Sequence, residues 1–507
     1  MRMPWTRLSS CGPAARALLA ISVVAAGGCG QVEKAPLPEA LVVVDTNLPV
    51  PLVVGRLRVD LYTEDGTWFE SNDFGRADVR DWPVSFSVYS PDEGEGRGIF
   101  VRLRAYPEGY VETYEGERVR DWDAPLAQPQ ATREPRLLRD GVDATPAEAP
   151  LPLMTVDRLV FVRLEPGKRG RLPVLLHGAC VGTMAHVGPE GRPALGVSTS
   201  CVDKEKERSL VAEGALEANM DRPTSSAIGT WLREPCEPDA PDSPTVCIAG
   251  GATVLGTVEN SDYAASIASM LNTVPVRIFG LHRYYLDRDE VTVARARAAI
   301  EAGYTGARPA RNDGPVGPRT TRDQDCTFSS TPMGREDYAA TCMGWDGARA
   351  MCQFFGGDLP TELQWEHAAT VAGHAQKRRF PWGNDAPTCE RTVVDREPAG
   401  GPSGHCAALG RGPRPSSESE GDLSPLGIKR LAGNVSEFVL DEPLPYTADC
   451  WLKGPLVNPF CPPPKNADRR PFRGDGFIQL NPRPAYRTQL STYATLGFRC
   501  AYARRPR

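Results

Sequence analysis

The side chains of this chain that are best suited to chemistry are its thiols and imidazoles. Its 507 residues include 14 cysteines and 6 histidines. His177 and His186 flank a turn that contains Cys180, so one interpretation is a zinc site. No second Cys/His pair stands at ligand spacing, and histidines that end strands are the better interpretation. The sequence also lacks a Gly-x-Ser-x-Gly elbow, a phosphate loop, a dinucleotide fingerprint and a His-Glu-x-x-His motif.

Residues 1–29 predict where these thiols reside. Three arginines accompany an apolar run at 17–26 that is too short to span a bilayer as a mature helix. The run ends in Ala26-Gly-Gly-Cys29, which is typical of a bacterial lipoprotein signal with Cys29 as the lipidated residue. The alternative is an ordinary secretory signal that is cleaved nearby. No later run is apolar enough for a transmembrane helix, so we expect the membrane to be a partner through a lipid anchor alone.

The predicted location is therefore the cell envelope, and the remaining cysteines fit it. Gly30 follows the lipidated cysteine, which favours an outer-membrane protein that faces the periplasm or the exterior. In such an oxidising compartment the 12 cysteines left after Cys11 and Cys29 predict disulfides. Pairing of sequence neighbours would join 180 with 201, 236 with 247, 326 with 342, 389 with 406, and 450 with 461. Many other pairings remain open at this point.

Length and composition limit the class of protein. A chain of this length is too long for one ordinary core and indicates roughly two or three domains. The net charge of -6 and the pI near 5.7 argue against a nucleic-acid partner, because no basic surface dominates. The 49 glycines and 48 prolines favour loops and short strands over long helices.

The first half of the chain has the pattern of an all-β domain. After a polar tether at 30–38, several segments alternate apolar with polar residues, as half-buried antiparallel strands do. Short Asp-Gly, Ser-Pro and Glu-Gly pairs separate them, which predicts a β-sandwich-like domain over 39–245. Residues 121–152 show no periodicity and predict a long loop within it. The expected strands are 40–44, 57–62, 84–89, 99–106, 157–164 and 170–177.

The second half predicts a few short helices between loops. One helix is expected from about Val293 to Ala302, where Gly303 ends it. A second should begin with Asp346 as its N-cap and end at the glycines 356–357. Thr361 and Gln364 have the spacing of a capping box, which predicts a third helix start.

Five motifs of this half, in this order and spacing, resemble the formylglycine-generating enzyme (sulfatase-modifying factor) family. The resemblance covers about 250–503 and implies an irregular, loop-rich α+β fold of the C-type-lectin-like kind over 246–507. The motifs are Leu359-Pro-Thr-Glu-Leu-Gln-Trp-Glu366, Phe380-Pro-Trp-Gly-Asn384, Leu431-Ala-Gly-Asn-Val-Ser-Glu-Phe438, Phe472-Arg-Gly-Asp-Gly-Phe477 and Leu496-Gly-Phe-Arg-Cys-Ala501.

The same resemblance argues against the family's oxidase chemistry. Members that oxidise cysteine use a pair of thiols to bind copper(I), because thiolates select this soft ion. The corresponding positions here are Gln479 and Pro484, so we expect no copper and no catalytic residue. The sequence favours a non-catalytic module that binds an unknown extracytoplasmic protein or peptide. The alternative is an enzyme, either a formylglycine-generating oxidoreductase or a related metal-dependent oxidase on the same fold.

The resemblance also implies a calcium site, a groove and one long-range disulfide. In the family, calcium is held at the segment that matches 433–437, which implies ligands from Gly433, Asn434, Val435 and Glu437. The alternative is that Glu437 is simply a salt-bridged loop residue. A shallow groove that receives extended peptide would include Arg473, Gly474, Gln479 and Arg487. The family pairs the cysteines that correspond to Cys352 and Cys500.

Overall fold

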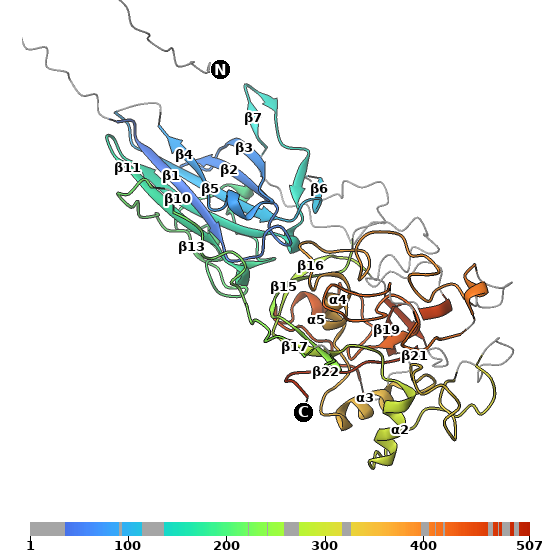
Figure 1. Cartoon of the computed structure of the whole chain (residues 1–507). Coiled ribbons are helices and arrows are strands. Elements are labelled where there is room, and N and C mark those ends of the chain that lie inside the picture. Colours follow the sequence, from blue (N-terminus) through green and yellow to red (C-terminus); the bar gives the residue numbers. More distant parts are fainter. Residues whose placement is uncertain are drawn as a thin grey trace, which may run out of the picture.

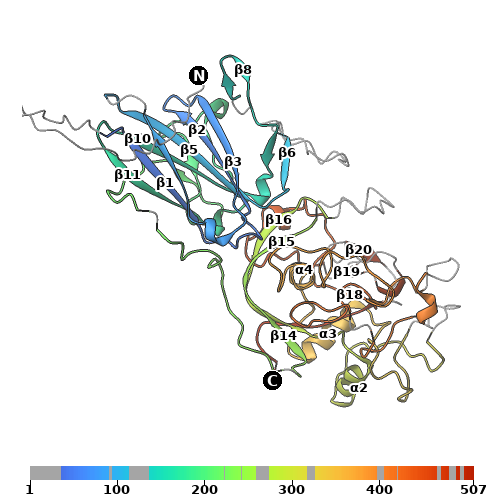
Figure 2. The same ribbon diagram turned by 45° about the horizontal axis from the view of Figure 1, so that its top comes forward.

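The chain folds into two parts that follow one another along the molecule (Figure 1). The computed structural model describes residues 36–506, except for 91–93, 114–135, 222, 241, 258–272, 317–325, 397–404, 411, 419–420, 465–469, 475, 479–486 and 491–495. The N-terminal part is rich in strands, and the C-terminal part is an α+β region with few helices. Figure 2 shows strands β1 to β5, between Glu39 and Tyr106, toward one end and helices α2 (Val293–Glu301) and α3 (Trp345–Phe354) toward the other.

Two sheets make up most of the N-terminal part. The three-stranded sheet has the order β11-β1-β4 and the four-stranded sheet has the order β10-β5-β2-β3. All neighbours in them are antiparallel except β1 and β11, which run parallel. The strands are β1 (Glu39–Thr46), β2 (Arg56–Thr63), β3 (Trp68–Gly75), β4 (Val84–Tyr89), β5 (Arg97–Tyr106), β10 (Val156–Leu164) and β11 (Arg169–Leu176).

Three two-stranded ladders and four short 3-10 helices complete this part. The ladders are β6 (Val111–Thr113) with β9 (Glu148–Pro150), β7 (Leu138–Arg139) with β8 (Val142–Asp143), and β12 (Thr199–Ser200) with β13 (Ser209–Leu210). The 3-10 helices are η1 (Val79–Asp81), η2 (Pro152–Met154), η3 (Gly178–Cys180) and η4 (Pro189–Gly191).

The two large sheets share one buried apolar cluster. Ala40, Val42 and Val44 alternate along β1 and are fully buried, as expected for one face of a pleated strand. Val101 and Leu103 of β5 belong to the same cluster. The alternation read from the sequence therefore reflects the residues that build this core.

The opposite face of the four-stranded sheet buries charges beside a second apolar cluster that includes Phe100 and Phe161. Arg102 of β5 binds Asp157 of β10 at 2.8 Å, and both side chains are almost completely buried. On the same sheet Arg104 pairs with Asp60, which also contacts Arg58. Each buried charge thus has a partner of opposite sign, which offsets the cost of removing it from water.

Five of the six segments predicted as strands in this part fall within strands, the sixth, 170–177, runs one residue past the end of β11, and the prediction of a strand-rich region is confirmed. The predicted loop 121–152 contains β7, β8 and β9 after its undescribed portion. β7 and β8 form a hairpin around Asp140 and Gly141, which both have positive φ, as a two-residue turn of this kind requires. The predicted domain boundary at 245/246 lies at the first residue of strand β14 (Thr245–Ile248) and stays a prediction.

The connection between the parts is packed. The ring of Trp231 packs directly against two glycines. A Cβ atom placed on Gly178 would lie 2.3 Å from this ring, and one placed on Gly280 would lie 3.1 Å from it, so there is room for glycine only. Gly178 belongs to the N-terminal part and Gly280 to the C-terminal part. Lys206 Nζ donates to the backbone oxygen of Lys453 at 2.9 Å, which adds a polar contact across the joint.

The C-terminal part contains short strands and four helices among its described residues. Besides β14, the strands are β15 (Gly251–Leu255), β16 (Arg277–Leu281), β17 (Tyr284–Asp287), β18 (Ser436–Phe438), β19 (Arg470–Arg473), β20 (Arg487–Leu490), β21 (Leu496–Gly497) and β22 (Ala501–Tyr502). The helices are α2 (Val293–Glu301), α3 (Trp345–Phe354), α4 (Glu362–Thr370) and α5 (Asp449–Leu452), with the 3-10 turns η6 (Ala407–Leu409) and η7 (Gly476–Ile478). The sheets have the orders β14-β17-β22, β15-β16 and β20-β19-β18-β21.

The helix ends test the predicted caps. The capping box of α4 is confirmed, because Thr361 accepts from the Gln364 amide and the Gln364 side chain accepts from the Thr361 amide. The predicted N-cap Asp346 is wrong, since α3 starts one residue earlier, at Trp345, with Gly344 as its N-cap. Asp346 lies instead in the first turn, where its negative charge suits the helix dipole.

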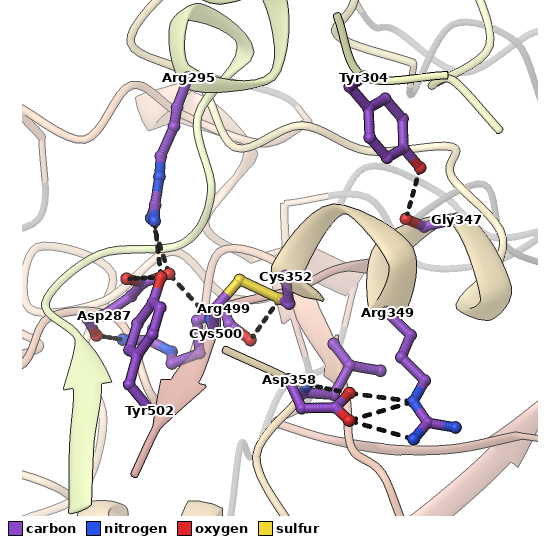
Figure 3. Close-up of a disulfide and its surroundings, with 11 residues drawn as sticks. Asp287, Arg295, Tyr304, Gly347, Arg349, Cys352, Asp358, Arg499, Cys500 and Tyr502 are labelled. Carbon is purple, nitrogen blue, oxygen red and sulfur yellow. Dashed lines mark hydrogen bonds and ion pairs between the residues drawn. A yellow bond between two sulfur atoms is a disulfide. The ribbon is translucent and has the colours of Figure 1, made fainter. Parts of the chain in front are cut away.

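Six disulfides close the chain on itself. They join 180–201, 236–247, 326–342, 352–500, 389–406 and 450–461, which are the five neighbour pairs and the pair implied by the family. Cys352 of α3 and Cys500 are separated by 148 residues, and Figure 3 shows their bond beside Tyr502 and below Arg295. Six disulfides are typical of proteins outside the cytoplasm.

Candidate functional site

The motif-bearing segments of the C-terminal part meet around one small sheet. Glu437 of β18 stands opposite Arg473 of β19 on one side and Gly497 of β21 on the other. Helix α4 packs near this sheet, and its Trp365 ring approaches the backbone of Gly474. Segments that are more than 100 residues apart in the sequence therefore contribute side chains to one place.

Glu437 is the centre of a fully buried ion pair. Arg499 donates from Nε and Nη2 to the Glu437 carboxylate at distances of 2.6–2.9 Å. The indole Nε1 of Trp365 donates to Glu437 Oε2 at 2.7 Å. Burial acts to lower the pKa of Arg499, but Glu437 outweighs it and raises the pKa. The result is a guanidinium that stays charged and holds three segments together.

Arg473 forms a second buried network on the neighbouring strand. Its Nη2 lies 2.9 Å from a carboxylate oxygen of both Glu362 and Glu366, which are one turn apart on α4. The hydroxyl of Tyr446 accepts from Arg473 at 2.7 Å. Lys377 binds Glu366 from the other side. Burial acts to raise the pKa of Glu366, but Lys377 and Arg473 outweigh it and lower the pKa.

A third buried carboxylate, Glu290, lies behind the 433–437 segment. Asn434 Nδ2 donates to Glu290 Oε1 at 3.0 Å, and Arg430 Nε stands 3.0 Å from Oε2. Burial raises the pKa of Glu290 to about 7, with the nearby Glu437 charge adding to the effect. The backbone of Asn434 is left-handed, with φ of 66°. This conformation turns its side chain toward Glu290 and suits asparagine better than most residues.

The side-chain oxygens of the predicted calcium set are used by protein donors. Both oxygens of Glu437 accept from Arg499, and Asn434 Oδ1 accepts from the Arg414 amide at 2.8 Å. A calcium ion requires six to eight oxygen ligands, including carboxylates that are free to face it. Glu437 does not fit that role in this arrangement, which agrees with the alternative of a salt-bridged residue. Calcium at Gly433, Asn434, Val435 and Glu437 stays a prediction.

The predicted groove residues lie deeper than a ligand surface requires. Arg473 is completely buried and Gly474 is buried beside Trp365. Arg487 lies in β20, where its backbone stands opposite Arg473. Gln479 and the proposed lipidation site Cys29 lie outside the described residues. Arg473 and Gly474 therefore support the sheet from within, and the groove stays a prediction.

The described cysteines and His177 have structural partners. Every described cysteine is in a disulfide, including Cys180, so the suggested zinc site lacks its thiolate. His177 caps η3 by accepting from the Ala179 amide at 3.2 Å. The described part of the chain contains no group of three His, Cys, Asp or Glu residues that could hold a metal ion. It also contains no helix able to cross a bilayer.

The network around Glu437 was only partly visible in the sequence. The motifs named Glu437, Arg473, Trp365 and Arg499, but Glu437 meets Trp365 and Arg499 across separations of 72 and 62 positions. The i, i+4 spacing of Glu362 and Glu366 was the available signal for a shared cation. No signal marked Glu290 or Tyr446.

The fold and this site define a class of protein: a disulfide-closed, loop-rich α+β domain built around a buried Glu–Arg pair. The family described as Sulfatase-modifying factor enzyme 1-like domain matches residues 234–504. The chain therefore belongs to this family.

Its relatives include enzymes of known type. The chain is 28% identical over 195 residues to the formylglycine-generating enzyme of Bos taurus and 29% identical over 186 residues to that of Streptomyces coelicolor. These matches cover 34% and 33% of this chain and 46% and 54% of the relatives, so the chain spans about half the length of the curated relatives it matches. PvdO from Pseudomonas aeruginosa is a similar solved structure, with 18% identity, a TM-score of 0.37 and coverage of 53% of this chain and 98% of PvdO.

Proposed function

We propose that this protein is a non-catalytic member of the family that serves as a binding or scaffolding module at the cell envelope. The observation that carries the proposal is the use of the thiols. Every cysteine in the described part of the chain is tied into a disulfide, and Gln479 and Pro484 stand where the oxidase pair would be. Without two free thiolates the chain lacks the soft ligands that copper(I) needs.

The ligand is an extracytoplasmic protein or peptide. A surface that receives extended peptide can persist after the chemistry is lost, because its shape depends on the buried networks beneath it. Arg473 and Glu437 anchor these networks and remain fully paired. The N-terminal strand-rich part would orient this surface with respect to the membrane, to which the lipidated Cys29 would attach the chain.

A mass-spectrometric assay tests the absence of oxidase activity. The oxidatively folded chain is loaded with copper(I) and incubated with a Cys-x-Pro-x-Arg peptide. We expect no formylglycine and no stoichiometric copper or iron in the purified protein. Conversion of the peptide cysteine would refute the proposal and favour the oxidoreductase alternative. The double variant Gln479→Cys/Pro484→Cys is the matched control, because it restores thiols at the two corresponding positions and nothing else.

Membrane fractionation tests the anchor separately. The full chain and its Cys29→Ser variant are expressed in a bacterial host, and their distribution between membrane and soluble fractions is compared. We expect the native sequence in the membrane fraction and the variant in the soluble exported fraction. Equal distribution of the two would show that Cys29 carries no lipid.

A further inference from the structure

The two large N-terminal sheets have four edge strands, and two of them are covered by the chain itself. On β11, the backbone of Arg171 exchanges two hydrogen bonds with Glu217, and Pro173 offers no amide at all. On β10, the carbonyl of Phe161 accepts from the Gly214 amide at 2.8 Å. Both strands are thereby closed to further pairing.

The third edge, β3, is protected by charge. Its exposed or half-exposed residues include Glu70 and Asp73, and its pairing with β2 contains a register shift. The hairpin strand β7 also approaches it. Charged side chains, bulges and covering segments are the usual means by which proteins prevent an edge from pairing with another chain.

β4 is the fourth edge, and the described part of the chain gives it none of these protections. Its sequence, Val84-Ser-Phe-Ser-Val-Tyr89, contains no charged residue and no proline, and its register with β1 is unbroken. The Ser90 amide donates to the Pro38 carbonyl, so hydrogen-bonded pairs fall on even-numbered residues of this strand. Ser85, Ser87 and Tyr89 therefore direct their backbone groups away from β1. Among the described residues, none forms a hydrogen bond with those groups.

A hollow opens where β4 ends, and its size is within the range of roughly 300–1,000 Å³ that is usual for ligand pockets. Its volume is 660 Å³, and Phe69 of β3 and Tyr89 of β4 stand on its wall with 37% and 52% of their surface exposed. The turn after β2 and the start of β5 complete the wall. Two exposed aromatic side chains beside an open strand edge can accept an apolar side chain from outside.

The rim of this hollow carries two carboxylates, Glu64 and Asp65, and one guanidinium, Arg97. Glu64 is already paired with Arg163 at 3.0 Å, and Arg97 lies 3.8 Å from Glu95. Asp65 accepts hydrogen bonds from its own turn, including one from the Thr67 amide at 3.2 Å. Hydrogen bonds from Thr63 and Thr67, together with the charge of nearby Arg192, lower the pKa of Asp65, but no cationic group of the described residues forms a salt bridge with Asp65. A basic residue of a ligand would complement it.

We propose that β4 is a docking site for an extended segment of a partner protein. The segment adds as a further strand beside β4, bonds the outward backbone groups of Ser85, Ser87 and Tyr89, and places an apolar side chain in the hollow. A basic side chain follows next to Asp65. A second copy of this chain is a poorer occupant, since its own β4 carries no basic residue. The site lies in the N-terminal part and does not depend on the function proposed for the C-terminal part.

Peptide binding to the full chain tests the site. The probes are fluorescein-labelled eight-residue peptides in which threonine alternates with valine, phenylalanine or tyrosine, with lysine at both ends, and a matched set that ends in glutamate. Fluorescence anisotropy gives the Kd. We expect saturable binding of at least one lysine-ended peptide and at least tenfold weaker binding of its glutamate-ended match, because of Asp65.

The matched variants are Ser87→Pro and Ser87→Ala. Both substitutions remove the hydroxyl of residue 87, but only proline also removes its outward-facing amide. Proline is tolerated at such a position because the missing amide does not bond to β1. We expect Ser87→Ala to bind like the native chain and Ser87→Pro to bind at least tenfold more weakly. Equal binding by the two variants, or no binding by any lysine-ended peptide, would overturn the proposal. Loss of a concentration-dependent dimer in Ser87→Pro, without peptide binding, would also overturn it and identify a second copy as the occupant.

A second measurement does not depend on the folding of Ser87→Pro. Amide hydrogen exchange of the native chain is followed with and without the best peptide. We expect slower exchange at 85, 87 and 89 and no change at the inward amides of 84, 86 and 88. Protection that spares the outward amides would overturn strand addition.

Discussion

Replacing Glu437 by glutamine distinguishes a structural ion pair from a calcium ligand. The carboxylate accepts four hydrogen bonds, three from Arg499 and one from Trp365, and neither Glu437 nor Arg499 has measurable exposed surface. Glutamine removes the charge and turns one acceptor into a donor that faces the donors of Arg499. Because Arg499 would then be buried without a counter-ion, we expect a loss of about 3–5 kcal/mol in the free energy of unfolding.

The assay is denaturant unfolding with disulfides intact, in calcium and again in a chelator. A structural pair predicts the same loss in both conditions, whereas a calcium ligand predicts a loss only when calcium is present. Glu418→Gln is the control, because Glu418 pairs with Arg414 on the surface and should cost roughly 0–1 kcal/mol. A loss below about 1 kcal/mol for Glu437→Gln, or a loss that disappears in the chelator, would refute the role of Glu437 as a structural ion-pair partner of Arg499.

Two further predictions concern His367 and the long-range disulfide. Burial, with the Lys377 charge adding to it, lowers the pKa of His367 to about 4. Between about pH 6.5 and 4, His367 is protonated in the unfolded chain but not in the folded one. The free energy of unfolding should therefore fall by roughly 3 kcal/mol as the pH drops through this range. His367→Gln should flatten this part of a Tm-versus-pH profile, and an unchanged profile would contradict the assignment. Replacing both Cys352 and Cys500 by serine should cost about 5 kcal/mol, against about 3 for the 236–247 pair, since the closed loop is longer. Equal shifts in Tm for the two double variants would argue against a loop-length effect.

Local signals in the sequence predicted local structure well. The alternation of Val42 and Val44 marked β1, and the Thr361–Gln364 spacing marked the start of α4. The Asp140-Gly141 turn was present in the sequence, but its flanking strands have two residues each and show no alternation. Such short strands exist because neighbouring segments hold them, which periodicity does not report.

The site was less predictable because its contacts are long-range. Arg473 belongs to a recognised motif, yet the groove prediction placed it where a ligand could touch it. In the structure, Glu362 and Glu366 from α4 surround it and take up its charge. Which carboxylates meet a given arginine depends on how distant segments pack, and the spacing of residues along the chain does not determine that packing. The resemblance to a family therefore located the buried centre but not the roles of its residues.

The position of β1 in its sheet has a mechanical consequence. β1 lies between β11, which runs parallel to it, and β4, which runs antiparallel, and its residues 39–46 pair with β11 along their full length. A pull on the chain ahead of Glu39 acts along the strand, so the hydrogen bonds on both sides are loaded in shear and must break together. The N-terminal sheet would therefore resist extension strongly at the point where the proposed lipid anchor would load it.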